Sequence, residues 1–177
     1  MFEYNGNNEK IIEATKKAND KSLIESVTNR ISKKPYYDMS NMNGKELSKW
    51  FSNVFSSSKV EIKTYRPKWR FSKAMGYYSG GDEIFINQYK LSSISEVSLI
   101  SLFYHEFGHY VDNQLDHPLY ANHGDNSSKN KESTFQYSLN RYVNDYFNKD
   151  KTNKDDTQIK KYTPWYKRFL KKLTGYL

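Results

Sequence analysis

Cysteine is absent from this chain of 177 residues. Its absence excludes disulfides, thiolate zinc fingers, cysteine-ligated iron–sulfur clusters and cysteine nucleophiles. Internal repeats are also missing, and no apolar run approaches the roughly 20 residues of a membrane-spanning helix.

The first residues, Met1 to Asn5, are acidic and polar, which does not predict a signal peptide. We therefore expect a cytoplasmic protein by default. Secretion, or association with a phage or mobile element, stays open for a processed chain or a fragment.

The residues that are present indicate a folded protein with a polar surface. Hydrophobic residues make up 36% and aromatic residues 16% of the chain, and tyrosine alone occurs 16 times, so aromatic rings can fill a core with few aliphatic side chains. The length suits a single domain spanning residues 1–177. The net charge of +8 raises the question of a nucleic-acid or membrane partner.

Hydrophobic periodicity predicts helices first and strands second. Residues 1–34 show helical spacing, and Asn19-Asp20 is a point where two helices could be separated. A further helix is predicted from Asn43 to Phe55. Strands are predicted over 60–64, 71–79 and 83–87, with a turn at Gly80-Gly81-Asp82 between the last two.

A long helix follows, predicted from a capping box of Ser93 and Glu96 to about Leu115. Two more helices are predicted over 131–147 and 158–173. The order predicts an α+β fold with a small mixed or antiparallel sheet. Its three parts are a helical segment (1–34), a helix, sheet and long helix (43–115), and C-terminal helices (131–173).

The long helix contains the sequence His-Glu-Phe-Gly-His at 105–109, which is an HExxH motif. His105 and His109 are four residues apart, so on a helix both imidazoles lie on one face and can bind one zinc ion. Glu106 lies beside that face and is suited to hold a water molecule next to the metal. The alternative interpretation is a pair of ordinary helical histidines.

The distribution of charge supports the metal interpretation. Residues 91–128 contain no lysine or arginine, and their charged residues are all acidic. Ammonium groups near a dication would oppose its binding. The positive charge lies elsewhere in the chain, so nucleic acid is not the favoured partner.

A zinc site needs a third protein ligand. Asp112 is roughly 10 Å along the helix axis from His105, so it suits a hydrogen bond to a ligand histidine better than ligation. We predict Glu132 as the third ligand, because it opens the 131–147 helix; the alternative is a carboxylate that stabilises that helix end. The alternative ligands that stay open are His117, His123 and Asp125.

The stretch from His105 to Asp112, HEFGH-x-V-D, resembles the active-site helix of the anthrax lethal factor and Pro-Pro endopeptidase-like family. The resemblance covers about residues 95–112. It implies a zincin-like fold of the gluzincin type, one zinc ion per chain held by His105, His109 and Glu132, and Glu106 as general base. The family's oxyanion-stabilising tyrosine matches Asp125 here, so Tyr120 and Tyr137 are the candidates for that role.

The predicted function is that of a metalloprotease, a zinc-dependent endopeptidase that uses a metal-activated water to hydrolyse peptide bonds. Its predicted partner is a protein or peptide, held by strand addition to the hairpin of residues 75–86. One alternative is an ImmA-like regulatory metallopeptidase, which the short interval between His109 and Glu132 favours. The other is a basic nucleic-acid or membrane-binding module with a non-catalytic zinc site, suggested by the basic aromatic helix at 158–173.

Overall fold

The computed structural model describes most of the chain, and two compact units divide it at Phe147 and Asn148. The described ranges are residues 1–38, 40, 42–68, 73–114 and 134–152, with side chains described up to Asn148. The second unit, Asn148–Leu177, is described only where it completes the last helix. The predicted helix at 158–173 lies outside the described residues.

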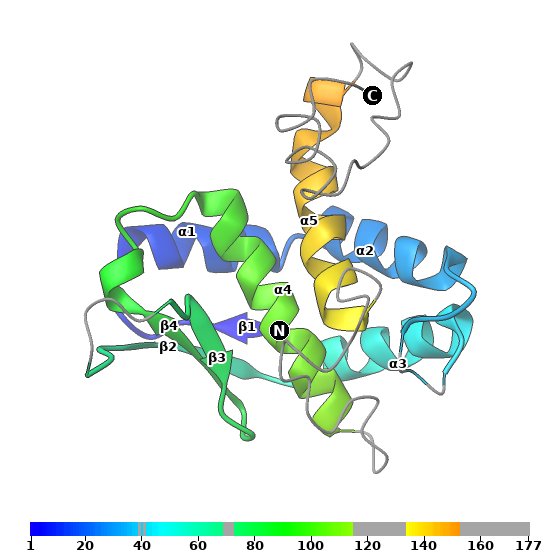
Figure 1. The fold of residues 1–177 in the computed structure, drawn as a ribbon, viewed down its shortest axis with the longest axis horizontal. Helices are drawn as coiled ribbons and strands as arrows, with labels where there is room; N and C mark the ends of the chain where they lie inside the picture. The colour runs from blue at the N-terminus through cyan, green and yellow to red at the C-terminus, as the bar shows by residue number, and fades with distance from the viewer. Residues whose placement is uncertain (39, 41, 69–72, 115–133, 153–177) are drawn as a thin grey trace, which may run out of the picture. The chain divides into compact units, whose positions relative to one another are not determined.

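The first unit is an α+β fold, as predicted, with a small mixed sheet of four strands (Figure 1). The elements in chain order are β1 (Phe2–Glu3), α1 (Glu9–Ala18), α2 (Lys21–Lys33), α3 (Gly44–Ser57), β2 (Val60–Tyr65), β3 (Gly76–Tyr78), β4 (Glu83–Asn87), the short 3₁₀ helix η1 (Gln88–Lys90), α4 (Glu96–Asn113) and α5 (Phe135–Thr152), whose last residues extend into the second unit.

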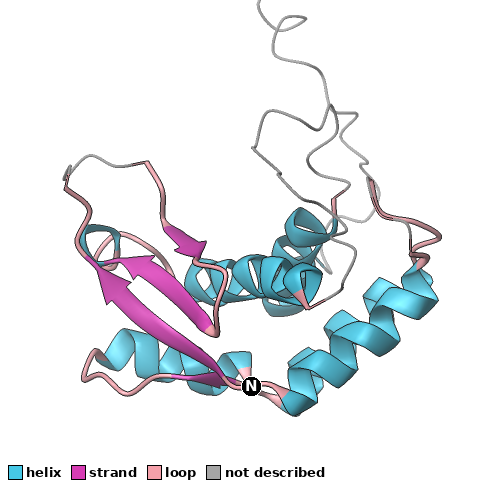
Figure 2. Cartoon of the chain, turned by 90° about the horizontal axis from the view of Figure 1, so that it is seen from below, coloured by secondary structure: helices cyan, strands magenta, loops and turns pink. Residues whose placement is uncertain are grey.

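The strand order in the sheet is β1-β2-β4-β3. β2 pairs in parallel with β1 and β4, whereas β3 pairs with β4 in the antiparallel direction (Figure 2). β2 and β3 therefore follow each other in the chain without being neighbours in the sheet. The physical reason is burial: β4 inserts Ile84 and Ile86 into the core beside Ile62 of β2, so these two strands are the inner strands of the sheet.

The helix ends follow local capping chemistry. Asp20 begins α2 by accepting the amides of Ser22 and Leu23, and these bonds separate it from α1 as the sequence suggested. The side chain of Asn43 forms a capping box with Glu46 at the start of α3.

The predicted start of α4 at Ser93 is wrong. Its N-cap is Ser95, which accepts the amide of Ser98, while the Ser93 hydroxyl donates to the carbonyl of Lys90 in the preceding turn. α4 ends at Asn113.

An aromatic cluster joins the sheet to the helices. Phe2 of β1 is 2% exposed and its ring contacts Phe55 of α3 and Phe107 of α4, with centroids 5.5 and 5.4 Å apart. Phe51 packs against the same Phe107 ring at 5.6 Å. The sequence prediction placed Phe2 in a helical segment and missed β1. A two-residue strand has no periodicity of its own, and its register with Val60 is set by the sheet.

Candidate metal centre

The helix α4 lies between the sheet edge β3 on one side and α5 on the other (Figure 1). Its inner face is fully buried in the aromatic core. The residues of this face are Ile100, Phe103, Tyr104, Phe107 and Val111, each 0% exposed. This packing fixes the rotation of α4 about its axis, and thereby the direction of its remaining residues.

His105 and His109 lie side by side on the half-exposed face of α4. Their ring centroids are 5.3 Å apart and the ring planes make an angle of 71°. Both side chains are half-buried, so solvent has access to the pair. Glu106 lies between them in sequence and is only 7% exposed. The structure thus brings together the three residues of the HExxH motif on one helical turn and a half, as expected for i and i+4 positions.

The sheet edge lies along one side of this turn. A Cβ built on Gly76 of β3 would lie 3.2 Å from Cδ2 of Leu102 on α4, so strand and helix are in direct contact. Asn113 donates to the Tyr78 hydroxyl at 3.1 Å, and the Tyr110 hydroxyl donates to Asp82 at 3.0 Å. Burial is the main cause that raises the pKa of Tyr78 and Tyr110 above the usual range, so both hydroxyls keep their protons at neutral pH.

The helix α5 lies along the other side. It crosses α4 at Gly108, where a Cβ would come within 3.0 Å of Cγ of Gln136 and of Cδ1 of Leu139. The Tyr137 ring stands edge-on to His105, with centroids 4.9 Å apart and an interplanar angle of 80°. Of the two tyrosines predicted near the site, Tyr137 is therefore next to a candidate metal ligand.

Residues 91–128 contain no lysine or arginine, but lysines of α1 contact α4 and the loop before it. Lys17 of α1 forms an ion pair with Glu96 at 2.6 Å, and Lys10 donates to the carbonyl of Leu91 at 2.7 Å. Both contacts are at the N-terminal end of α4 and the loop before it. The charge of Glu96 is thus balanced by α1, which the sequence distribution alone did not predict.

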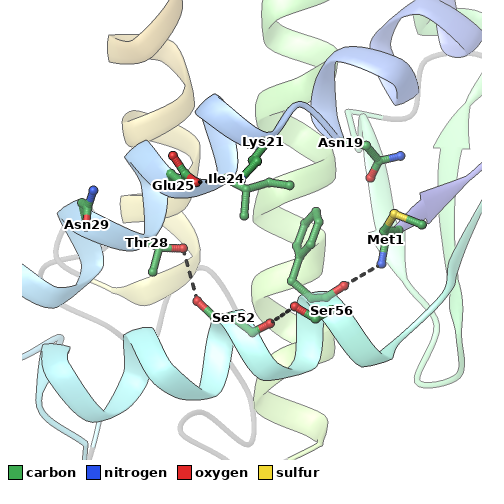
Figure 3. A pocket seen from close by; sticks show the side chains of 10 residues that line it. Met1, Asn19, Lys21, Ile24, Glu25, Thr28, Asn29, Ser52 and Ser56 are labelled. Carbon is green, nitrogen blue, oxygen red and sulfur yellow. Dashed lines mark hydrogen bonds and ion pairs between the residues drawn. The ribbon is translucent and has the colours of Figure 1, made fainter.

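A pocket of about 640 Å³ lies elsewhere, between α2 and α3 (Figure 3). Thr28 and Ser52 face each other across it with their hydroxyl oxygens 3.4 Å apart, and the Met1 ammonium donates to the Phe55 carbonyl at 2.8 Å. Its described lining comes from Met1, Asn19, α2 and α3. None of these residues is on α4 or α5, so this pocket is separate from the histidine pair.

Several predicted site residues lie outside the described residues. They are Glu132, the alternatives His117, His123 and Asp125, and Tyr120. Within the described part of the chain, no group of three His, Cys, Asp or Glu side chains is placed to hold a metal ion. The prediction that Glu132 is the third ligand therefore stays a prediction.

The described donors suit zinc in their chemistry. Two imidazoles, close together on one helix face and reachable from solvent, are the pair that a zinc site of the HExxH type requires. Asp112 is 4% exposed. It is three residues after His109, so it lies on the same face of α4 as the two histidines.

Sequence reasoning missed the part that Gly108 and Gln136 play. A glycine inside a helix is a signal for close approach of another backbone, and Gly108 has that function at the α4–α5 crossing. Gln136 gave no signal, because a polar residue near a helix start is normally solvated.

Sequence and structure comparisons give no family assignment: no family model, curated protein or solved structure matches the chain.

Proposed function

We propose that the protein is a zinc-dependent endopeptidase with a zincin-like fold. The observation that supports this most directly is the pair His105 and His109, with ring centroids 5.3 Å apart on a helix anchored in the core. In the proposal these two residues bind one zinc ion, and Glu132 completes the protein ligands. Gln136, near the start of α5, packs against α4, and Glu132 is four residues before it in the sequence.

Zinc in such a site supplies Lewis-acid chemistry and lowers the pKa of a bound water towards about 7. The chain's own residues then do the proton chemistry. The Glu106 carboxylate accepts the proton of the attacking water and delivers it to the leaving amine. The Tyr137 hydroxyl, on the ring beside His105, donates to the developing oxyanion.

The edge strand β3 is the proposed place for the substrate backbone. Within the described residues β3 pairs with β4 alone, so its second edge is open for another strand. β3 contacts α4 directly, which puts a strand added there next to the HExxH helix. Main-chain hydrogen bonds would hold the peptide, and this kind of recognition depends little on substrate sequence.

The first experiment measures metal content and cleavage together. Purified protein should contain about one zinc per chain, measured by mass spectrometry of the metal. Glu106→Gln should keep the zinc and lower the cleavage rate of a peptide library by about 10²–10⁴-fold. Glu96→Gln makes the same change on the same helix, at a residue paired with Lys17, and should cleave like the wild type.

Two results would contradict the proposal. If the purified protein contains no stoichiometric zinc, the proposed metal centre is wrong. If a zinc-bound Glu106→Gln variant cleaves as fast as the wild type, Glu106 is not the general base. Glu132→Gln tests the third ligand in the same assay: zinc loss supports it, whereas retention of zinc transfers the role to His117, His123 or Asp125.

A further inference from the structure

The side chain of Gln136 is buried at the crossing of α4 and α5. It is 1% exposed, and its Cγ lies 3.0 Å from the position that a Cβ of Gly108 would occupy. Gly108 is three residues after His105 and immediately before His109. The carboxamide is bonded directly to Cγ, so it starts against the helical turn that carries both histidines.

Neither end of this carboxamide has a hydrogen-bond partner among the described residues. Both Oε1 and Nε2 of Gln136 are buried without one. Leaving one buried polar group unsatisfied costs about 1–3 kcal/mol, and here two are unsatisfied. Native proteins satisfy nearly all such groups, so an exception calls for a specific partner.

The surroundings of Gln136 indicate what that partner is. The next residue, Tyr137, stands against the ring of His105 at 4.9 Å, while Leu139 shares the contact with Gly108. Leucine or methionine at position 136 would fill the same space against Gly108 without burying a polar group. A carboxamide has in addition a donor and an acceptor, and both suit the oxygen ligands of a metal ion, such as a carboxylate or a water.

We infer that Gln136 is a positioning residue of the metal centre, and that its carboxamide hydrogen-bonds to the oxygen ligands of an ion held by His105 and His109. This inference rests on the proposed zinc site. Without the ion the carboxamide lacks these partners among the described residues. The metal-free protein is therefore less stable with glutamine at position 136 than it would be with an apolar residue there. Binding of the ion supplies them.

The test compares metal-free stability with zinc affinity in Gln136→Met and Gln136→Leu. Both variants replace the carboxamide with an apolar side chain of similar size, which can pack against Gly108 as Gln136 does. Metal-free protein should unfold at the same or a higher temperature than the wild type, measured by circular dichroism. The zinc dissociation constant, from competition with a chromophoric chelator, should rise about 10–100-fold. The absorption spectrum of the cobalt(II)-substituted protein should also change.

Thr15→Val is the matched control. The Thr15 hydroxyl of α1 is likewise buried without a hydrogen-bond partner among the described residues, and valine has the same shape. This variant should be at least as stable as the wild type, with unchanged zinc affinity.

Three outcomes are distinguishable. Zinc affinity equal to that of the wild type in both Gln136 variants overturns the inference and leaves the zinc site in place. Lower metal-free stability in both variants also overturns it, because the carboxamide would then have its partner within the protein itself. A wild-type chain that binds no zinc contradicts the proposed function instead.

Discussion

The inner face of α4 and its crossing with α5 differ in how completely the buried polar groups are satisfied within the described residues. On the inner face, the Phe107 ring contacts the rings of Phe2, Phe51 and Phe55 at centroid distances between 5.1 and 5.6 Å. The buried hydroxyl of Tyr104 donates to the carbonyl of Ala18 at 2.9 Å. The outer face has the two half-exposed histidines, and at its crossing with α5 the buried amide of Gln136 has no hydrogen-bond partner within the described part of the chain.

This difference separates stability from function along a single helix. Aromatic packing and a satisfied hydroxyl hold α4 in place, so its crossing with α5 can keep a buried carboxamide that costs stability. If this is right, substitutions on the inner face change the free energy of unfolding, whereas substitutions on the outer face change zinc affinity. The predictions below test that separation, from the largest expected effect to the smallest.

Phe107→Ala should cost about 3–5 kcal/mol in the free energy of unfolding, because it removes a fully buried ring from the aromatic cluster. Urea unfolding measures the loss, and the zinc affinity of the remaining folded protein should not change. Ile12→Ala is the control: Ile12 is 42% exposed, so its change should stay within about 0.5 kcal/mol. Loss of zinc binding without loss of stability would contradict the separation of the two faces.

His109→Ala should lower the zinc affinity and leave the free energy of unfolding almost unchanged, the opposite of Phe107→Ala. Zinc affinity should decrease by more than the roughly 100-fold that loss of an outer-shell partner costs, since His109 is one of the two proposed direct ligands. The metal-free protein should lose about 1 kcal/mol or less, because the imidazole is half-exposed. Asn113→Ala, one turn further along α4, should leave the zinc affinity unchanged. Equal zinc affinities in chelator competition for the two variants would refute the role of His109.

Gly108→Ala should affect both quantities, because Gly108 lies where α5 touches α4. Its Cβ would meet Cα of Gln136 at 3.2 Å as well as two side chains, so the α5 backbone must move. Overpacking of about 1–3 kcal/mol outweighs the gain of up to ~1 kcal/mol from removing a helical glycine. We expect a net loss of about 1–2 kcal/mol in thermal or urea unfolding, with weaker zinc binding. Gly81→Ala, where a Cβ meets nothing within 4 Å, should be close to neutral.

Tyr104→Phe should cost about 1 kcal/mol at neutral pH, since it removes the bond to Ala18. Burial raises the pKa of Tyr104, so the folded state keeps a proton that the unfolded state releases above about pH 10. Wild-type stability therefore decreases as the pH rises through that value, and Tyr104→Phe should decrease less steeply. Urea unfolding at pH 7 and at about pH 10.5 measures both effects. Tyr36→Phe, at a residue 67% exposed, should show the wild-type slope.

Local sequence patterns predicted where the helices α1 to α5 lie along the chain, but not where α4 begins or the bounds of α5. The helix predicted from Asn43 to Phe55 corresponds to α3, whose N-cap is Asn43, because helix periodicity and capping involve residues within a few positions of each other. The same locality explains why the HExxH residues could be placed on one face of α4. β4 was predicted with correct bounds for a similar reason, since Ile84 and Ile86 alternate with less buried residues.

Contacts between distant residues were not predictable in this way. Phe2 pairs with Val60, and β4 lies between β2 and β3, because several buried strands compete for the centre of one sheet. Helix ends are also decided by competition: the Ser93 hydroxyl donates to Lys90, which leaves Ser95 as the N-cap. A single segment contains no information about which of these partners will be present.

The sequence by itself determined the HExxH motif, its helix and the apolar stripe opposite the histidines, because all three depend on spacing within a few helical turns. Only the tertiary structure decided that α5 crosses that helix at Gly108, that Tyr137 stands against His105 and that the carboxamide of Gln136 is buried there. These contacts join residues 28 (Gly108 and Gln136) and 32 (His105 and Tyr137) positions apart in the sequence. They arise from burying two helix faces together, which no local pattern specifies.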